Sequence, residues 1–381
     1  MTVAQYMRLA LRLARRGYGA TSPNPMVGAV LVRGGTIIGR GWHRRAGAAH
    51  AEIEALRDAQ KRGHSSRGAT LYVTLEPCCT QGRTPPCTAA IIAAGIQRVI
   101  AGATDPNPKH SGKGFKILRR AGIAVTTISE IAPLLTQDCT RLNESFNHWV
   151  VHRTPFVLVK AAMTLDGKIA TAGGESKWIT GAKARDFGMH LRRGSDAILV
   201  GINTILADDP SLTVRPKRAD GGGNLAKPIR RIALDSMART PLNAKIVSDE
   251  FTASTTIVVG EQAPQKRVAA LEKKVNVVTA PLVRSAIDLR WLLQRLGAEN
   301  VTRLLIEGGG EVNASFLLGG LAQRVAFFYA PKILGGRAAR TGVAGEGAKS
   351  LRDLVELQAV QWRKQGEDLL LTALVHGDGA S

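Results

Sequence analysis

Apolar runs bounded by turn residues alternate with segments of helical periodicity along the first 145 residues. Such runs are typical of buried strands, whereas apolar positions that recur every three or four residues indicate helices. Arg33-Gly34-Gly35 separates two of the runs and is typical of a hairpin turn. The predicted strands are 26–32, 36–41, 71–75, 98–103 and 124–128, and the predicted helices are an amphipathic first helix, 49–59, 88–95 and 115–121. The pattern therefore predicts helices packed against one sheet.

A second pattern of the same kind begins at residue 156, after a helix and connector at 129–153. Residues 215–228 are polar, glycine-rich and flanked by proline, which predicts a mobile surface loop. The predicted strands are 156–163, 197–200, 231–234, 256–259, 275–278, 304–306, 325–329 and 369–375, and the predicted helices are 183–193, 286–296 and 311–318. We therefore predict an α/β protein with two domains, residues 1–147 and residues 148–381.

The composition indicates a folded protein without a membrane span. Hydrophobic residues make up 44% of the chain, and it contains no apolar run of about 18 residues or more. The basic first segment is predicted to be a helix rather than a secretion signal, because its arginines recur at helical spacing. Four cysteines in 381 residues do not suggest a disulfide framework. A reducing, cytoplasmic location is therefore expected.

The net charge of +22 is spread over both halves of the chain. Such an excess can indicate nucleic-acid binding, the steering of phosphorylated small molecules, or a generally basic proteome, which we favour for most of the charge. Aromatic residues make up only 4% of the chain, so there is little surface on which bases could stack. We expect no nucleic-acid partner.

His50, Glu52, Cys78 and Cys87 form the most specific chemical pattern in the chain. One imidazole and two thiolates provide three ligands for a tetrahedral zinc ion and leave the fourth position to water, as in catalytic zinc sites. Bound zinc lowers the pKa of that water towards neutrality. Glu52 stands two residues after the first ligand, where it can carry the proton. The combination is typical of zinc-dependent nucleobase deaminases, in which the glutamate is not a ligand.

The spacing of the two cysteines departs from the usual Pro-Cys-x-x-Cys, because eight residues separate Cys78 from Cys87. The glycine and the prolines between them break regular structure, so a loop is predicted that can return Cys87 to the metal. Cys79 is an adjacent competitor for the ion. Single histidines and reduced cysteines are often inert core residues, but these candidates all lie near the ends of predicted elements.

A second group of polar residues follows the apolar strands of the second half. Residues 304–310 (LLIEGGG) end a predicted strand with Glu307 and three glycines, where backbone N–H groups can approach a phosphate. Tight packing at the turn explains these glycines equally well. Ligands of open α/β sheets bind beyond the carboxyl ends of the strands, and a surface charge is the simpler explanation for any one residue there. The ionisable candidates are Lys160, Asp208 and Glu307, with Arg192 and Arg215 able to grip a phosphate.

Motifs in both halves resemble one family, the bifunctional RibD proteins of riboflavin biosynthesis, over nearly the whole chain. They are SPNPMVGAVLV (22–32), HAE (50–52), TLEPC (74–78), GRTPPC (82–87), DPNP (105–108), TLDG (164–167), GESKWIT (174–180), LADDPSLTVR (206–215) and IEGGG (306–310). GRTPPC together with DPNP distinguishes this family from tRNA adenosine and cytidine deaminases, which use the short Cys-x-x-Cys.

The resemblance implies a cytidine-deaminase-like α/β/α domain followed by a dihydrofolate-reductase-like α/β domain. It also implies two reactions on one phosphorylated pyrimidine. The first is zinc-dependent hydrolytic deamination of 2,5-diamino-6-ribosylamino-4(3H)-pyrimidinone 5′-phosphate. The second is NADPH-dependent reduction of the ribosyl chain to give 5-amino-6-ribitylamino-uracil 5′-phosphate. A homo-oligomer, either a dimer or a tetramer, is implied as well, and the preference for NADPH over NADH rests on the resemblance alone.

Site residues can be carried over from the family motif by motif. The resemblance implies that zinc is held by His50, Cys78 and Cys87, that Glu52 is the catalytic proton carrier and that Asn24 orients the pyrimidine. Lys160 and Asp208 match catalytic positions near the ribose. Cofactor positions are matched by Ala162, Trp178, Thr204, Asp208, Gly309, Gly310, Glu311, Val312, Asn313, Ala314 and Ser315. Substrate positions of the reductase are matched by Ser176, Arg192, Leu212, Arg215 and Glu307.

One motif departs from the family. Cys79-Thr80-Gln81 stands where the family commonly carries Ser or Asn and then His, so a substrate-side contact is expected to differ there.

Two other functions remain open from the residues. One is an RNA-editing deaminase with a basic accessory domain, which would be expected to carry the short Cys-x-x-Cys and stacking aromatics. The other is a zinc-stabilised nucleic-acid-binding module, in which Glu52 would be dispensable and binding would fall steeply with salt.

Overall fold

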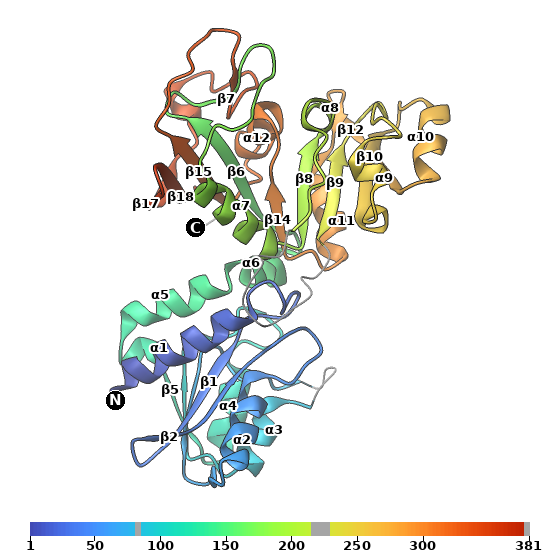
Figure 1. Cartoon of the computed structure of the whole chain (residues 1–381). Coiled ribbons are helices and arrows are strands. Elements are labelled where there is room, and N and C mark those ends of the chain that lie inside the picture. Colours follow the sequence, from blue (N-terminus) through green and yellow to red (C-terminus); the bar gives the residue numbers. More distant parts are fainter. Residues whose placement is uncertain (81–84, 215–228, 377–381) are drawn as a thin grey trace. The chain divides into compact units, whose positions relative to one another are not determined.

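The structure, a computed structural model, describes residues 1–80, 85–214 and 229–376 and separates into two compact units, Met1–Arg153 and Thr154–Ser381 (Figure 1). We call them unit 1 and unit 2. The division follows α6 (Glu144–His152), whereas the sequence places it after residue 147, inside this helix. No helix in the described part of the chain is long and apolar enough to cross a membrane. The loop predicted at 215–228, which includes Arg215, lies outside the described residues.

Unit 1 contains a five-stranded sheet between two layers of helices, as the alternating pattern predicts. The strand order is β2-β1-β3-β4-β5, with β1 antiparallel to both of its neighbours and β3, β4 and β5 parallel to one another. The strands are β1 (Gly28–Arg33), β2 (Thr36–Trp42), β3 (Thr70–Val73), β4 (Arg98–Ala101) and β5 (Ala124–Thr127).

The two faces of this sheet bury different helices. Along β1, Leu31 packs with α2 (Ala51–Lys61), α3 (Cys87–Ala93) and α4 (Lys113–Arg120), and the adjacent residue, Val30, packs with α1 (Val3–Ala14) and α5 (Pro133–Leu142). The alternation follows from the two-residue period of a strand. A Cβ on Gly41 of β2 would lie 2.2 Å from the backbone oxygen of Ala51. Glycine at this position therefore allows α2, with its first residues, to lie directly on the sheet.

Unit 2 contains a nine-stranded sheet in the order β11-β10-β9-β8-β14-β6-β15-β18-β17. The first seven strands are parallel, and the hairpin of β17 and β18 closes the sheet in the antiparallel direction. The first strand in sequence, β6, lies inside the sheet between β14 and β15. The strands are β6 (Phe156–Thr164), β8 (Ala197–Gly201), β9 (Arg230–Leu234), β10 (Thr255–Gly260), β11 (Asn276–Ala280), β14 (Arg303–Ile306), β15 (Arg324–Ala330), β17 (Leu357–Gln365) and β18 (Asp368–Val375).

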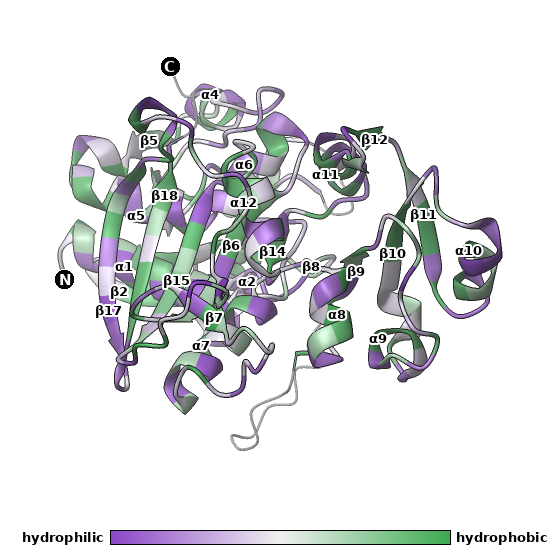
Figure 2. Cartoon of the chain, turned by 90° about the horizontal axis from the view of Figure 1, so that it is seen from above, coloured by the Kyte–Doolittle hydropathy of each residue, from purple (hydrophilic) through white to green (hydrophobic). Residues whose placement is uncertain are grey.

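Helices cover both faces of the parallel strands. One core contains side chains of α11 (Leu289–Ala298) and α12 (Gly310–Leu317). The other contains side chains of α7 (Ala182–Arg193), α8 (Ile202–Asp208), α9 (Lys245–Ser248) and α10 (Gln265–Glu272). Figure 2 shows hydrophobic residues along β9 and β10 and hydrophilic residues on β17. Two short ladders pair β7 (Lys168–Ala170) with β16 (Arg340–Thr341) and β12 (Leu282–Val283) with β13 (Ala286–Ile287).

The α/β class and the predicted strands are confirmed, but the helix predicted at 286–296 is wrong at its start. Residues 286–287 form β13, and α11 begins at Leu289 because the Asp288 side chain accepts hydrogen bonds from the backbone N–H groups of Arg290 and Trp291. An aspartate that caps the first free N–H groups fixes the start of a helix.

Candidate active sites

Three potential metal ligands meet at one end of the unit 1 sheet. Cys78 follows β3, His50 is the N-cap of α2, and Cys87 is the first residue of α3. The His50 Nδ1 atom lies 3.5 Å from Cys78 Sγ and 3.3 Å from Cys87 Sγ. The backbone N–H of Cys87 donates to Cys78 Sγ at 3.3 Å. All three ligand atoms lie within 4.8 Å of one another.

This donor set fits a tetrahedral zinc ion. Zn–S bonds of about 2.3 Å and Zn–N bonds of about 2.0 Å place sulfur and nitrogen ligands roughly 3.5 Å apart, close to the distances between His50 and the two sulfurs. The hydrogen bond from the Cys87 side chain lowers the pKa of Cys78 to about 4, and the thiolate is the form that binds metal. Among the described residues, Cys79 is not a member of this ligand group.

Glu52 lies beside the ligands in the first turn of α2 and is only 3% exposed. Burial raises the pKa of Glu52 to about 7, and the negative charge of Cys78 contributes in the same direction. Its carboxyl group also hydrogen-bonds with the Cys87 side chain. A carboxyl group that titrates near neutral pH can accept a proton and return it. The arrangement can therefore serve a proton transfer next to a metal.

Asn24 is held by a histidine that the sequence pattern did not single out. The His43 ring is buried, its Nδ1 lies 3.1 Å from the backbone oxygen of Ala49, and its Nε2 lies 3.3 Å from Asn24 Nδ2. A carbonyl oxygen can only accept, so Nδ1 carries the proton and Nε2 accepts from the Asn24 amide. Burial lowers the pKa of His43, which favours this neutral ring. The signal available in the sequence was a histidine two residues after the predicted strand 36–41.

A cavity of about 300 Å³ opens next to these groups. One carboxylate fixes a loop in its wall: the buried Glu76 accepts the backbone N–H groups of Asp105 and Gly112 on Oε2, and those of Gly114 and Phe115 on Oε1. The loop 105–112 is thereby tied to the strand end that carries Cys78. The polar residues lining the cavity include Asn24, His43, His50, Glu52, Glu76, Cys78, Thr80, Asp105, Asn107, His110 and Arg153.

The departure at Cys79-Thr80-Gln81 falls on the wall of this cavity. Thr80 lines it, and Gln81 lies outside the described residues. His110, on the 105–112 loop, also lines this cavity, so a histidine is present there. The DPNP motif at 105–108 was the available signal for this loop, but the sequence assigned no role to its residues.

Unit 2 has two cavities at the carboxyl ends of its parallel strands, of about 850 Å³ and 1200 Å³. Lys160, Ala162, Trp178, Arg192, Leu212 and Glu307 line the smaller one. Glu311, Val312 and Ser315 line the larger one. The two cavities share wall residues, namely Ile169, Ser176, Thr204, Asp208 and Gly309. The structure thus brings most of the predicted substrate and cofactor residues into adjoining spaces, although the predicted cofactor residues Ala162 and Trp178 line only the smaller cavity.

Glu307 is the charged centre of the smaller cavity. Its carboxylate accepts two hydrogen bonds from Arg192, from Nε at 2.9 Å and from a terminal nitrogen at 2.8 Å, and the Lys160 Nζ lies 3.9 Å away. Burial alone would raise the pKa of Glu307, but the charges of Arg192 and Lys160 outweigh it and hold this pKa at about 2. Arg192 also donates to the backbone oxygen of Thr213 at 3.0 Å. Among the described residues, these hydrogen bonds use three of the five N–H groups of Arg192.

Asp208 stands on the wall shared by both cavities, at the last position of α8. Its Oδ1 accepts from the Ser176 hydroxyl at 2.9 Å and lies 3.9 Å from Lys177 Nζ. Asp208 therefore links the GESKWIT segment (174–180) to the loop that follows α8.

The sequence leaves two explanations for the glycines at 308–310, tight packing and the approach of a ligand, and each applies to some of them. A Cβ on Gly308 would lie 2.5 Å from the side chain of Val312, and a Cβ on Gly310 would lie 2.4 Å from the backbone oxygen of Thr341. A Cβ on Gly309 would have no atom within 4 Å. Gly309 faces both cavities. Of the predicted cofactor segment, Asn313 and Ala314 are buried away from the cavities, and Asn313 Nδ2 donates to the backbone oxygen of Gly342.

Comparison with known proteins links both units to one family. Residues 155–371 match the family described as RibD C-terminal domain, and residues 1–103 match the cytidine and deoxycytidylate deaminase zinc-binding region. The riboflavin biosynthesis protein RibD of Actinobacillus pleuropneumoniae is 41% identical over 375 residues, which cover 98% of this chain and 96% of that protein. The protein of the same name from Aquifex aeolicus is 41% identical and covers 96% of each chain.

Solved structures agree over the whole chain. Acinetobacter baumannii RibD superimposes with a TM-score of 0.84 at 34% identity, and 98% of each chain is covered. A diaminohydroxyphosphoribosylaminopyrimidine deaminase/5-amino-6-(5-phosphoribosylamino)uracil reductase from Thermotoga maritima superimposes with a TM-score of 0.82 at 33% identity, again over 98% of each chain.

Proposed function

This chain belongs to the RibD family of riboflavin biosynthesis proteins, and from that membership we propose which of its residues carry each reaction. The protein is bifunctional: a zinc-dependent deaminase precedes an NADPH-dependent reductase, and both act on a small-molecule pyrimidine. The two alternatives with nucleic acid as ligand leave the reductase half without a function.

We propose that His50, Cys78 and Cys87 hold the zinc ion. When bound, zinc supplies a water nucleophile whose pKa lies near neutrality. Glu52 would accept the proton of the attacking water and pass it to the pyrimidine ring. It would then carry a second proton, from the hydroxyl group added to the pyrimidine carbon, to the leaving amine, so that the C–N bond breaks and ammonia departs. The support for this role is that Glu52 is buried against the ligands with a pKa raised to about 7.

The wall of the unit 1 cavity supplies the proposed substrate contacts of the deaminase. Asn24, whose amide is oriented by His43, would contact the pyrimidine. His110 presents its ring to the same cavity as Thr80, and we propose that it takes the place of the substrate-side histidine expected after Cys78. Arg153 lines the cavity with its guanidinium 5.3 Å from the Trp149 ring and would face the phosphate.

In unit 2 we propose that NADPH occupies the larger cavity and the phosphoribosyl substrate the smaller one. When bound, NADPH supplies a hydride to C1′ of the ribose, which opens to the ribityl chain. Lys160 and Asp208 would stand near the reacting ribose. Arg192 holds the Glu307 carboxylate in place, and its remaining N–H groups would face the substrate. Gly309 lets the cofactor approach the start of α12, since its Cβ position is open.

The assignment of the substrate and cofactor cavities rests on one observation. The two cavities share wall residues, among them Ser176, Thr204, Asp208 and Gly309. The test supplies the phosphoribosyl diaminopyrimidine with and without NADPH, and follows ammonia release and the nicotinamide absorbance band. We expect ammonia in both mixtures and NADPH oxidation only after ammonia release. Ammonia release without any NADPH oxidation would overturn the proposed reductase site.

We further propose a homo-oligomer and a cytoplasmic location. The sheet edge supports the former: β17 is exposed at eight of its nine residues, and Val360 and Trp362 on it are 45% and 56% exposed. An edge strand that presents apolar side chains and unpaired backbone groups can pair with another chain. A second copy of this chain is the proposed occupant. The location is supported by four free cysteines among the described residues.

A further inference from the structure

The segment 208–213, which begins with the last residue of α8, forms part of the smaller cavity and is fixed at alternate residues. It carries Asp208, Asp209, Pro210, Ser211, Leu212 and Thr213, all of which line that cavity. Asp209 and Leu212 have φ angles of 42° and 51°, a region that residues other than glycine adopt only when the surroundings hold them there.

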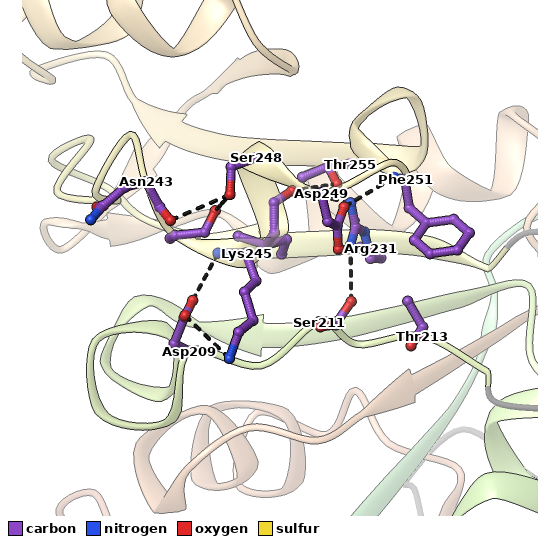
Figure 3. A network of polar contacts seen from close by, with 12 residues as sticks. Asp209, Ser211, Thr213, Arg231, Asn243, Lys245, Ser248, Asp249, Phe251 and Thr255 are labelled. Carbon is purple, nitrogen blue, oxygen red and sulfur yellow. Dashed lines mark hydrogen bonds and ion pairs between the residues drawn. The ribbon is translucent and has the colours of Figure 1, made fainter.

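Three residues outside this segment, Lys245, Arg231 and Arg192, hold positions 209, 211 and 213. The Asp209 carboxylate accepts the backbone N–H of Lys245 at 2.8 Å and lies 3.5 Å from Lys245 Nζ, and the Thr213 oxygen accepts from Arg192. Between these two, the backbone oxygen of Ser211 accepts from Arg231 at 2.9 Å (Figure 3). The contact to Arg231 comes from inside the protein, since this side chain is only 1% exposed.

All five N–H groups of Arg231 are used. Nε donates to Thr255 Oγ1 at 2.9 Å, one terminal nitrogen donates to Ser211 and to Asp249 Oδ2 at 2.6 Å, and the other donates to Ile246 at 3.1 Å and to Asp249 Oδ1 at 2.8 Å. A paired geometry of this kind is specific to the planar guanidinium group. Figure 3 shows Asp249, Thr255 and Ser211 arranged around Arg231.

Arg231 cannot touch a ligand directly, because it is buried and lines neither cavity of unit 2. Its position on β9 couples the cavity segment to α9 and to the start of β10 through the Ile246 oxygen and the Thr255 hydroxyl. We propose that the Arg231–Asp249 pair is a positioning element of the reductase, which holds the segment 208–213 in the conformation that binds the phosphoribosyl substrate. The inference rests on the proposed assignment of the smaller cavity to that substrate.

The test compares Arg231→Lys and Asp249→Asn with the wild-type full chain, and uses Arg230→Lys as the matched control. Lysine keeps the charge but cannot form the five hydrogen bonds, so we expect the reductase KM for the deaminated phosphoribosyl substrate to rise about tenfold, with kcat changed less than about threefold. Asp249→Asn should raise the same KM by a smaller factor. Arg230 neighbours Arg231 on the same strand and pairs with Glu299 at 2.6 Å at the surface, so its replacement should leave the KM unchanged.

Because unit 1 has its own core, deaminase activity shows only that unit 1 is intact. A retained reductase kcat and an unchanged thermal unfolding midpoint show that unit 2 has folded. An unchanged KM in both Arg231→Lys and Asp249→Asn would overturn the positioning role, and so would a loss of kcat and thermal stability without a rise in KM. A wild-type protein that releases ammonia but never oxidises NADPH would instead contradict the proposed function of the cavity.

Discussion

Glu52 shows how a single residue acquires a chemical role from its surroundings. Its neighbour on the same helix, Glu54, pairs at the surface with Arg44 and Arg57 at 3.2 Å, whereas Glu52 lies buried beside the metal ligands. The same side chain is therefore an ordinary carboxylate at position 54 and, at position 52, a buried group suited to the proton transfer that we propose.

We expect Glu52→Gln to reduce ammonia release about 10²–10⁴-fold, because glutamine cannot carry the proton. Zinc should remain bound, since the ligands His50, Cys78 and Cys87 are unchanged. The measurement is ammonia release together with zinc content, and Glu54→Gln is the control that should keep full activity. A Glu52→Gln enzyme that releases ammonia at the wild-type rate would exclude the proposed role.

The lowered pKa of Glu307 leads to a prediction about how the stability of the fold depends on pH. Arg192 and Lys160 hold its pKa at about 2, below the ordinary value of 4.5, so ionised Glu307 stabilises the fold above about pH 4.5 and loses this effect as the pH falls towards 2. We expect the free energy of unfolding to fall more steeply between about pH 5 and about pH 2 in the wild type than in Glu307→Gln. Urea unfolding followed by circular dichroism measures it, with the surface variant Glu299→Gln as control. Parallel pH dependence in wild type and Glu307→Gln would refute the stabilising role.

The sequence predicts the residues whose partners are close along the chain or belong to a recognisable motif. His50 and Glu52 stand together in one helical turn, and the strand ending at Cys78 was visible as an apolar run. Arg231 was seen only as the start of a predicted strand, because its partners Ser211 and Asp249 come from separate loops. A buried arginine is rare unless it is paired, and pairing is a property of the folded chain.

Among the elements, the buried strands were predictable and the edge strand was not. β6, β8 and β14 are apolar along almost their whole length, as central parallel strands require. β17 has no buried face, so it shows neither an apolar run nor alternation, and it forms because β18 pairs with it. The helix α10 also escaped prediction, since only Val268 and Leu271 of its residues are buried.

The exposed edge strand β17 leads to a prediction about the oligomeric state. If β17 pairs with a second copy, Val360→Lys should shift the protein towards the mass of one chain, 40.6 kDa, because a buried unpaired lysine disfavours the contact. Sedimentation velocity measures the mass of the wild type and the variant. Leu134→Lys replaces an equally apolar residue, 82% exposed on α5, and should leave the mass unchanged. A wild type that sediments as a single chain would disprove the proposed oligomer.

For the whole molecule, the two units have separate sheets and separate cores. The proposed metal ligands all belong to unit 1, and the two large cavities belong to unit 2. The stability of the reductase site should therefore not depend on the metal. Two patterns of apolar runs were enough to predict this organisation, although not the residue at which one unit ends, because α6 continues past the predicted boundary.

We expect a zinc chelator to abolish ammonia release and to leave NADPH oxidation intact when the deaminated substrate is supplied. Removal of a zinc ion takes away the activated water and the cross-link among three elements of unit 1 only. The measurement is each activity before and after chelation, and re-addition of zinc is the control that should restore ammonia release. Equal loss of both activities would contradict the independence of the two sites.

The place of β6 in its sheet has a consequence for the order in which the protein can fold during synthesis. This strand is made first in unit 2, yet its two partners, β14 and β15, begin only at Arg303 and Arg324. Domains made first generally fold first on the ribosome, so unit 1 can be complete while Phe156–Thr164 still lacks both neighbours. An apolar strand that waits for late partners is exposed to association with other nascent chains. We therefore expect nascent chains of this protein to be most prone to association while the segment between β6 and β14 is being made.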